Sequence, residues 1–369
     1  MKLDRSSGVL LHITSLPGRY GIGTLGPEAR QCADLLRKAG MRYWQILPIG
    51  PVDERLGYSP YASTSTFAGN FLFISLEKLA EETWFSGDIG PDPFTEDHIV
   101  PFNDVIKHKL PILKMAGDEF FSKAADAEKR DYDRFCKDEA YWLDDFALYS
   151  AVAEHTGEIN WLEWDTGISM REPKSIAQWD KKLAGEIRLQ KFIQYIFFRQ
   201  WSKFRQYCKE CNIQIIGDIP IYVTLESADA WANPDILILD EKTRRPLSVA
   251  GVPPDYFSDT GQRWGNPLYR WEAHEATGFA WWLERLQALA EELSRKHKVA
   301  ATPIAGDLAQ PDGVKRLIEA ISANRLIIDG LVNNAGYGVP GYYARTRWED
   351  QEAFLRQWWP RRANSHMCC

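Results

Sequence analysis

Three stretches of apolar residues, each ending in polar turn residues, predict three buried β-strands. They are GVLLHITSLPG (8–18), YWQILPIGP (43–51) and IQIIGDIPIYV (213–223). Near-continuous apolar strands of this kind are typical of a sheet that is covered by helices. Between the first two, apolar residues at helical spacing followed by a glycine predict a helix over 27–40. A strand, a helix and a strand in this order indicate a parallel sheet and an α/β fold.

A long helical segment separates the second predicted strand from the third. From about 103 to 212, aromatic residues and leucines recur every three or four residues, which predicts helices. The segment is too long for a single crossover, so we expect an inserted helical subdomain. The stretch 225–271 is dense in Pro, Gly, Asp and aromatic residues and predicts a long loop region with short elements. Loops of this length inside compact domains are commonly functional.

The character of the sequence changes near Leu286. Before this residue, aromatic and turn residues are dense. After it, the chain predicts a helix and two apolar strands, in LQALAEELSRKHKVAATPIAGDL and LIIDGLVNNAG. We call this position the junction, and it predicts a boundary between two different parts of the chain.

The composition is that of an ordinary globular protein. With 369 residues, of which 45% are hydrophobic, the chain can form one large or about two medium domains. A net charge of -7 argues against nucleic acid or an anionic membrane surface as a partner. No apolar run approaches the roughly 18 residues of a membrane span, and no signal peptide is recognisable, so we expect a cytoplasmic location. The sequence does not indicate the oligomeric state.

Six cysteines are sparse for this length, which agrees with a reducing compartment. Cys208 and Cys211 form a CxxC at the end of a predicted helix. The only further pair is the terminal Cys368 and Cys369. Two cysteines on one helix face are therefore favoured over a metal site.

Polar residues follow two of the predicted strands. Asp218 follows the apolar residues QIIG, and the loop 57–70 places hydroxyls and aromatic rings after the second strand. In parallel α/β folds the ligand site lies at the carboxyl ends of the strands, so these residues are candidates for ligand contact. Two alternatives stay open: Asp218 could cap nearby backbone amides, and 57–70 could be an ordinary packed loop.

Tryptophans are unusually frequent, with fifteen in the chain. Sugar rings have an apolar face and a hydroxyl rim, so a saccharide site favours flat aromatic rings beside Asp, Asn and Glu. Five of them lie in 225–282: Trp231, Trp264, Trp271, Trp281 and Trp282. Packing in a tryptophan-rich core is the alternative, and it suits Trp281 and Trp282.

Several of these segments resemble one enzyme family. The runs SSGVLLHITSLPGRYGIGTLG, YWQILPIGP, GYSPYASTSTFAGN, GDIPIYV, WANPDILILDE, VAGVPPDYFSDTGQRWGNPLYRW and TGFAWWLERL occur in family order. Over about residues 5–286 they closely resemble the 4-alpha-glucanotransferases, or amylomaltases. The resemblance implies a (β/α)8 barrel that transfers α-1,4-glucan segments between oligosaccharides through a covalent glycosyl-enzyme intermediate. Its partner would be an α-1,4-glucan or maltooligosaccharide, and it implies no metal or organic cofactor.

The resemblance also implies a set of substrate-binding residues. Two would line the groove after the second strand, one would contact the sugar from the third, two would lie on a loop above bound glucan, and two belong to the neighbouring motif. In this order they are Ser59, Tyr61, Asp218, Tyr256, Phe257, Trp264 and Asn266.

The catalytic acids that the resemblance implies have no counterpart here. In the family, a phrase like RIDHFRG on the next strand carries the nucleophilic aspartate, and the other acids follow it. No such phrase follows Leu286, and Asp329 lacks the flanking Arg and His. Retaining glycosyl transfer needs two carboxyl groups about 5 Å apart. We therefore predict no catalytic residue, an incomplete barrel and no transfer activity, with a non-catalytic glucan-binding protein as the alternative.

Residues after the junction resemble a second family. DGLVNNAGYG (329–338) and the preceding Asp307–Leu308 resemble short-chain dehydrogenases/reductases over about residues 286–356. This implies a partial Rossmann-like βαβ fragment. Its glycine-rich loop and Tyr-x-x-x-Lys motif have no counterpart, so an NAD(P)-dependent oxidoreductase is a second, less favoured alternative. The residues that would line a dinucleotide site are then relics: Asp307, Asn333, Asn334, Ala335 and Gly336.

The predicted organisation follows from both resemblances. Residues 1–286 form the first part of a barrel with the helical insertion 103–212. Residues 287–356 form a dehydrogenase-like fragment, and 357–369 form a disordered tail. The junction is interpreted as a fusion, which is either natural or an artefact.

Overall fold

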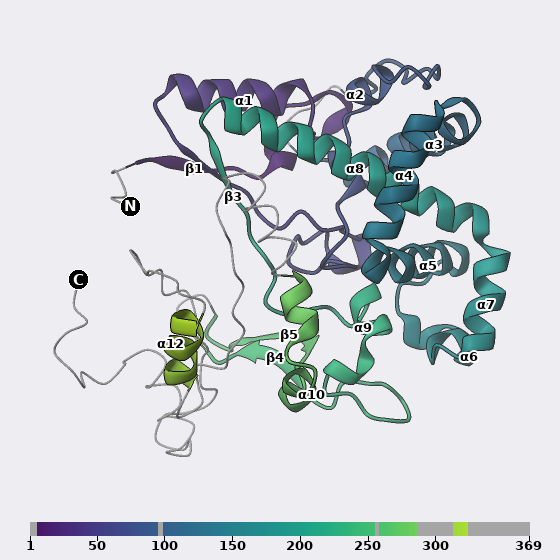
Figure 1. Cartoon of the computed structure of the whole chain (residues 1–369), viewed down its shortest axis with the longest axis vertical. Helices are drawn as coiled ribbons and strands as arrows, with labels where there is room; N and C mark the ends of the chain where they lie inside the picture. Colours follow the sequence, from purple (N-terminus) through teal and green to yellow (C-terminus); the bar gives the residue numbers. More distant parts are fainter. Residues whose placement is uncertain (1–5, 95–98, 255–257, 286–312, 324–369) are drawn as a thin grey trace. The chain divides into compact units, whose positions relative to one another are not determined.

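The structure is a computed structural model of the whole chain. It describes residues 6–94, 99–254, 258–285 and 313–323. The chain divides into two compact units, residues 4–247 and residues 1–3 together with 248–369 (Figure 1). The boundary predicted at residue 286 borders residues outside the described ranges and stays a prediction.

The larger unit contains a parallel sheet of three short strands, in the order β1 (Gly8–Leu10), β2 (Tyr43–Gln45) and β3 (Gln214–Ile216). Helix α1 (Pro27–Lys38) connects β1 to β2, which confirms the predicted strand, helix and strand. A Cβ at Gly8 would lie 2.5 Å from the carbonyl oxygen of Tyr43, so the close approach of β1 to β2 requires glycine. That these strands belong to an incomplete barrel stays a prediction.

The two faces of this sheet differ in burial. Val9, Trp44 and Ile215 pack into the main apolar core together with α1 and α8 (Ala184–Glu210). On the opposite face, Leu10 is 57% exposed and Ile216 is 43% exposed. The prediction of buried strands is therefore wrong for this face of β1 and β3. Side chains alternate along a strand, so every second residue points away from the covering helices.

The strands are also shorter than the predicted 8–18, 43–51 and 213–223. Each ends after three residues and continues as loop or 3-10 helix. Prolines such as Pro48 and Pro220 lack the N–H that would extend a ladder of hydrogen bonds. The apolar pattern located each strand correctly, but it did not distinguish a strand from the apolar loop that follows.

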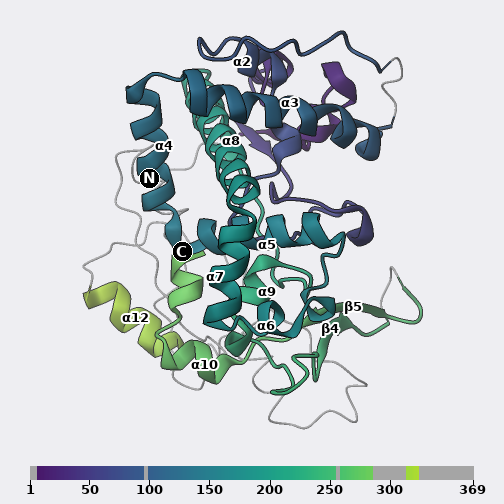
Figure 2. The ribbon, with the colours of Figure 1, turned by 90° about the vertical axis from the view of Figure 1, so that its right-hand side faces the viewer.

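The segment predicted to be helical, 103–212, is confirmed as helical. Apart from α8, its helices are α3 (Phe102–Lys123), α4 (Asp126–Asp138), α5 (Ala140–Thr156), α6 (Thr166–Ser169) and α7 (Pro173–Lys182). In Figure 2, α8 runs through the middle of these helices. It packs against α3, α4 and α5 and, through Phe204, against Trp44 of the sheet, with ring centroids 5.6 Å apart. One long helix therefore joins the helical segment to the core of the sheet.

Shorter elements connect these parts. Two are α-helices, α2 (Leu76–Ala80) and α9 (Ala228–Ala232). Six are 3-10 helices: η1 (Ile13–Ser15), η2 (Arg19–Gly21), η3 (Glu54–Leu56), η4 (Phe71–Phe73), η5 (Trp161–Glu163) and η6 (Pro234–Ile236).

A second apolar core lies around α5 and α9. Trp231 of α9 is fully buried there and donates a hydrogen bond of 3.0 Å from Nε1 to the carbonyl oxygen of Ile168. The guanidinium of Arg171 lies 4.2 Å from its ring centroid. Trp231 is therefore a core residue, and the interpretation of its ring as one suited to a saccharide site is wrong. Cys208 and Cys211 are buried in the main core as free thiols.

The smaller unit contains an antiparallel pair of strands, β4 (Val249–Val252) and β5 (Gln262–Pro267), followed by α10 (Trp271–Ala276). Trp281 and Trp282 follow in a further helical stretch, with ring centroids 5.1 Å apart, and Trp281 is buried. This confirms the core interpretation for Trp281, whereas Trp282 is half-buried. Helix α12 (Gly313–Ala323) is the described part of the predicted fragment 287–356, and the tail 357–369 lies outside the described residues.

Candidate functional site

Two predicted site residues meet beyond the carboxyl ends of β2 and β3. The Tyr61 hydroxyl, in the loop after β2, donates a hydrogen bond of 2.6 Å to Asp218 Oδ2, in the loop after β3. Tyr61 is 47% exposed and Asp218 is half-buried, so a ligand can reach both. The contact joins two separate loops. The position is that of a ligand site in a parallel α/β sheet.

The Tyr61 phenol remains protonated at neutral pH. The hydrogen bond to Asp218, together with partial burial and the carboxylate charge, raises the pKa of Tyr61 to about 12. The phenol is therefore the donor, and the carboxylate of Asp218 keeps lone pairs that can accept from ligand hydroxyls. The Ser59 hydroxyl oxygen accepts a hydrogen bond of 3.3 Å from the Tyr61 backbone N–H. These groups suit a hydroxyl-rich neutral ligand.

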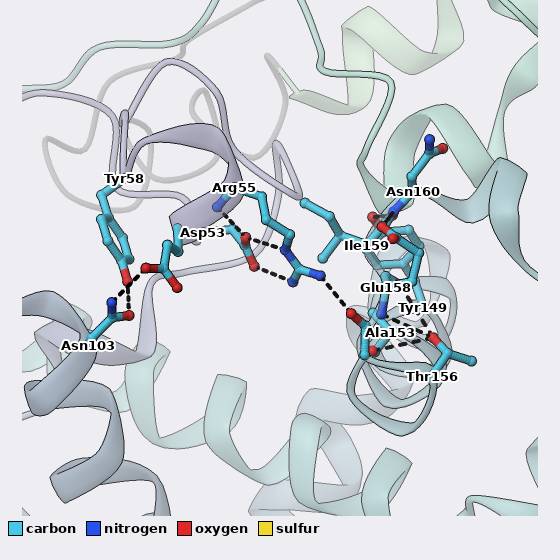
Figure 3. Close-up of polar contacts among 12 residues, drawn as sticks. Asp53, Arg55, Tyr58, Asn103, Tyr149, Ala153, Thr156, Glu158, Ile159 and Asn160 are labelled. Atoms are coloured by element: carbon cyan, nitrogen blue, oxygen red, sulfur yellow. Dashed lines mark hydrogen bonds and ion pairs between the residues drawn. The ribbon is translucent and has the colours of Figure 1, made fainter.

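The segment that carries Tyr61 is fixed at its start by a charged pair. Arg55 Nε and Nη2 each donate a hydrogen bond of 2.8 Å to the carboxylate of Asp53 (Figure 3). Arg55 Nη1 also donates to the carbonyl oxygen of Gly157, just after α5, at 3.1 Å. Burial alone would raise the pKa of Asp53, but the bonds to Arg55 outweigh it and lower this pKa. The pair thus ties η3 to the end of α5.

A second contact at the same end involves Tyr58. Its hydroxyl donates to Asn103 Oδ1, and Asn103 Nδ2 donates a hydrogen bond of 2.7 Å to Glu54 Oε1 (Figure 3). The Tyr58 ring stacks on Phe102, with ring centroids 4.5 Å apart. Tyr58 has a left-handed φ of 53°, which is unusual for a bulky residue. These contacts to α3 offset the backbone strain and orient the residues that follow.

The middle of the loop runs beside the segment that follows Asp218. The Thr224 hydroxyl donates to the carbonyl oxygen of Ser63 at 3.0 Å, and the Ala228 N–H donates to that of Thr64 at 2.9 Å. Thr66 donates twice to the buried carboxylate of Asp229, from its N–H at 2.8 Å and from its hydroxyl at 2.7 Å. The two loops are therefore joined along their length as well as at Tyr61.

The end of the loop is held by α8. Gln194, which is 2% exposed, accepts from the N–H of Gly69 at 2.8 Å and donates to its carbonyl oxygen at 2.9 Å. Six residues further along α8, Gln200 binds both backbone groups of Ser75 in the same way, at 2.7 and 3.0 Å. A Cβ at Gly69 would lie 2.0 Å from ring carbons of Phe197, so the close packing on α8 requires glycine.

His12 lies two positions after the end of β1. Its ring is largely enclosed and packs edge-on against Phe73, with centroids 5.4 Å apart. Burial lowers the pKa of His12 to about 4, so the imidazole is neutral at neutral pH. The neutral imidazole of His12, the protonated phenol of Tyr61 and the carboxylate of Asp218 thus follow the three strands at the same edge of the sheet.

Two other predicted site residues belong to the smaller unit. Trp264 and Asn266 lie on β5 of the smaller unit; Trp264 is 49% exposed and donates from Nε1 to Gln262 Oε1 at 3.1 Å. The remaining predicted residues lie outside the described residues: Tyr256, Phe257, Asp307, Asn333, Asn334, Ala335 and Gly336.

Sequence reasoning missed the residues that hold the loop. Asn103, Gln194 and Asp229 contact the loop from up to 163 positions away, and Arg55 joins its start to Gly157. No local pattern indicates such partners. The signal that was available is the capping preference of Asp53, whose side chain accepts from the N–H at the start of η3.

No group of three or more His, Cys, Asp or Glu side chains within the described residues could hold a metal ion. No helix within them has the length and apolar character needed to cross a membrane.

Comparison with known families confirms both resemblances seen in the sequence. Residues 11–294 match the model of the 4-alpha-glucanotransferase family, and residues 268–356 match that of the short chain dehydrogenases. The two matches overlap over 268–294, a range that contains the junction at Leu286.

Curated relatives and a solved structure agree with the first match. The chain is 45% identical over 291 residues to a 4-alpha-glucanotransferase of Thermus thermophilus, covering 79% of this chain and 57% of the relative. It is 44% identical over 286 residues to one of Synechocystis sp., covering 77% and 56%. An amylomaltase from Streptococcus agalactiae in complex with acarbose shares 38% identity at a TM-score of 0.73, covering 77% of this chain and 57% of that one. The chain thus spans little more than half the length of these relatives.

Proposed function

The chain belongs to the 4-alpha-glucanotransferase family, and from this premise we propose that it binds an α-1,4-glucan segment at Tyr61 and Asp218 without transferring it. The observation that carries the proposal is the hydrogen bond between these two side chains, which brings together a phenol oxygen and a carboxylate that can both accept from sugar hydroxyls, where the family motifs imply a glucan. The solved relative with 38% identity holds acarbose, an oligosaccharide analogue. That ligand supports the same class of ligand here.

Inactivity follows from the chemistry of retaining transfer. One carboxylate must attack the anomeric carbon while a second carboxyl group, about 5 Å away, protonates the leaving oxygen. The resemblance assigns the nucleophile to a phrase that would follow Leu286, where this chain instead matches a short chain dehydrogenase. Asp218 binds sugar hydroxyls in this scheme and has no partner acid assigned to it.

Calorimetric titration of the full chain with maltoheptaose tests the binding. We expect saturable binding that is weakened about tenfold in Asp218→Ala, since a charged hydrogen-bonding group is lost. Tyr61→Phe, which removes only the hydroxyl, should weaken it less. Asp240→Ala is the control, because Asp240 caps a turn at Thr243 in the same unit. Absence of binding by the unsubstituted chain would refute the proposal.

Incubation with maltotriose tests the inactivity. We expect no release of glucose and no longer maltooligosaccharides. If such products form and Asp218→Ala abolishes them, the chain is a transferase and the proposal of a non-catalytic binder is wrong.

A second candidate, a nucleotide-dependent oxidoreductase, is favoured by the match of residues 268–356 to short chain dehydrogenases. Within that match the sequence has no lysine after Gly336, so the lysine of the family's catalytic pair has no counterpart. We expect no quenching of protein fluorescence by NADH or NADPH. Saturable binding of either nucleotide would favour this candidate.

A further inference from the structure

Asp229 is buried between the two loops that carry the candidate site. It lies in the first turn of α9, eleven residues after Asp218, and is 5% exposed. Its two carboxylate oxygens accept from the N–H and the hydroxyl of Thr66, five residues after Tyr61. A buried carboxylate is retained only where hydrogen bonds compensate its loss of hydration, and Thr66 provides two.

We propose that Asp229 is a positioning residue, which sets the register between the Tyr61 loop and the Asp218 loop and so maintains the contact of Tyr61 with Asp218. The role of Asp229 in glucan binding rests on the proposed function. The proposal extends that function to a residue whose carboxylate binds Thr66, five positions after Tyr61. No reaction step is assigned to it.

The contacts around Asp229 explain how it could act at this distance. Thr224 and Ala228 bind the carbonyl oxygens of Ser63 and Thr64, and Asp229 binds Thr66, so three points of one loop are fixed to the other. Asp229 provides two of these hydrogen bonds, and both are charge-assisted, which makes them about twice as strong as neutral ones. Without it, Tyr61 would keep its neighbours in the chain but lose its fixed placement opposite Asp218.

Gln200 provides a matched comparison. It is 8% exposed, it makes two hydrogen bonds to one residue, Ser75, and it belongs to the same unit. Ser75 caps α2 and carries no residue of the candidate site. Loss of Gln200 should therefore destabilise the fold without moving Tyr61, whereas loss of Asp229 should do both.

The test compares four variants of the full chain: Asp229→Ala, Asp229→Asn, Thr66→Val and Gln200→Ala. Maltoheptaose affinity should fall about tenfold in Asp229→Ala and about threefold in Thr66→Val, which keeps the backbone bond. Asp229→Asn should restore most of the affinity, because its amide can accept from the Thr66 N–H and donate to the hydroxyl. Gln200→Ala should lower Tm by a similar amount and leave the affinity within about twofold. Equal losses of affinity in Asp229→Ala and Gln200→Ala would refute the proposal.

A second readout needs no ligand and so separates this proposal from the proposed function. 3-Fluorotyrosine is incorporated at position 61 and its 19F signal is recorded, with Asp218→Asn as the reference for an altered contact. We expect Asp229→Ala to shift or broaden the signal toward that reference and Gln200→Ala to leave it unchanged. An unaltered signal in Asp229→Ala overturns the positioning role, even if glucan binds. A shifted signal in a chain that binds no maltoheptaose supports the role and refutes only the proposed function.

Discussion

The segment that carries Tyr61 is held near the surface at its start and in the interior at its end. At the start, Arg55 has a side chain that is 45% exposed and bonds to Asp53 and the end of α5. At the end, Gln194 is 2% exposed and binds the backbone of Gly69. Lys109 is 0% exposed and binds carbonyl oxygens of η4 and of the residue that caps it. The hydrogen bonds at the interior end should therefore stabilise the fold more than those at the surface end. Breaking a buried hydrogen bond leaves a polar group that water cannot reach.

The largest effect that tests this difference between the two ends is expected at Gly69. Its substitution by alanine places a Cβ 2.0 Å from ring carbons of Phe197, so α8 and the loop must separate. We expect a loss of about 3 kcal/mol in the free energy of unfolding, measured by urea denaturation. Gly57→Ala is the control at the exposed end, where space is open and a left-handed φ of 66° is the cost, about 1 kcal/mol. Equal losses at both positions would contradict the comparison.

The buried amine of Lys109 should make stability depend on pH. It donates to the carbonyl oxygens of Leu72 and, at 2.7 Å, of Ile74. Burial outweighs the nearby charge of Glu77 and lowers the pKa of Lys109 from 10.5 to about 7. Between these values the unfolded chain binds the proton and the folded chain does not, so stability rises with pH. We expect the free energy of unfolding to increase by about 2 kcal/mol from pH 7 to pH 9.

Lys109→Met is the control for that dependence. It removes the titrating group and fills the same volume, at the expense of two unsatisfied carbonyl groups. The variant should be less stable at pH 9, and the increase between pH 7 and pH 9 should be smaller than in the unsubstituted chain. If both proteins show the same increase, other groups are its source and Lys109 stays charged inside the fold.

Local patterns in the sequence predicted local structure well and tertiary placement only in part. Apolar spacing and a glycine stop located α1, and apolar runs located β1, β2 and β3. The family motifs placed Tyr61 and Asp218 in one site, and their side chains do meet. The residues that fix the loop could not be predicted, because a partner such as Gln194, 125 positions from Gly69, becomes visible only when α8 packs on the loop.

A smaller effect should appear as coupling between the two interior contacts. Gln194 and Asp229 hold the same loop at Gly69 and Thr66, so removing one should reduce the cost of removing the other. In a double-mutant cycle of Gln194→Ala and Asp229→Ala, we expect a coupling of about 1 kcal/mol in the free energy of unfolding. The corresponding cycle of Gln194→Ala with Arg55→Ala should be additive within about 0.5 kcal/mol. Coupling of equal size in both cycles would mean that the two ends of the loop act as one unit.

The smallest effect is expected for Arg55→Ala by itself. The Asp53–Arg55 pair is bidentate, with two hydrogen bonds of 2.8 Å, but water reaches the guanidinium and screens its charge. We expect a loss below about 1 kcal/mol in the free energy of unfolding, falling further at 1 M salt. The pKa of Asp53 is lowered in the fold, so this contribution is present at neutral pH and disappears as the pH falls through that lowered pKa. A loss that is large, or that salt does not change, would show that the surface end of the loop is as strongly held as the interior end.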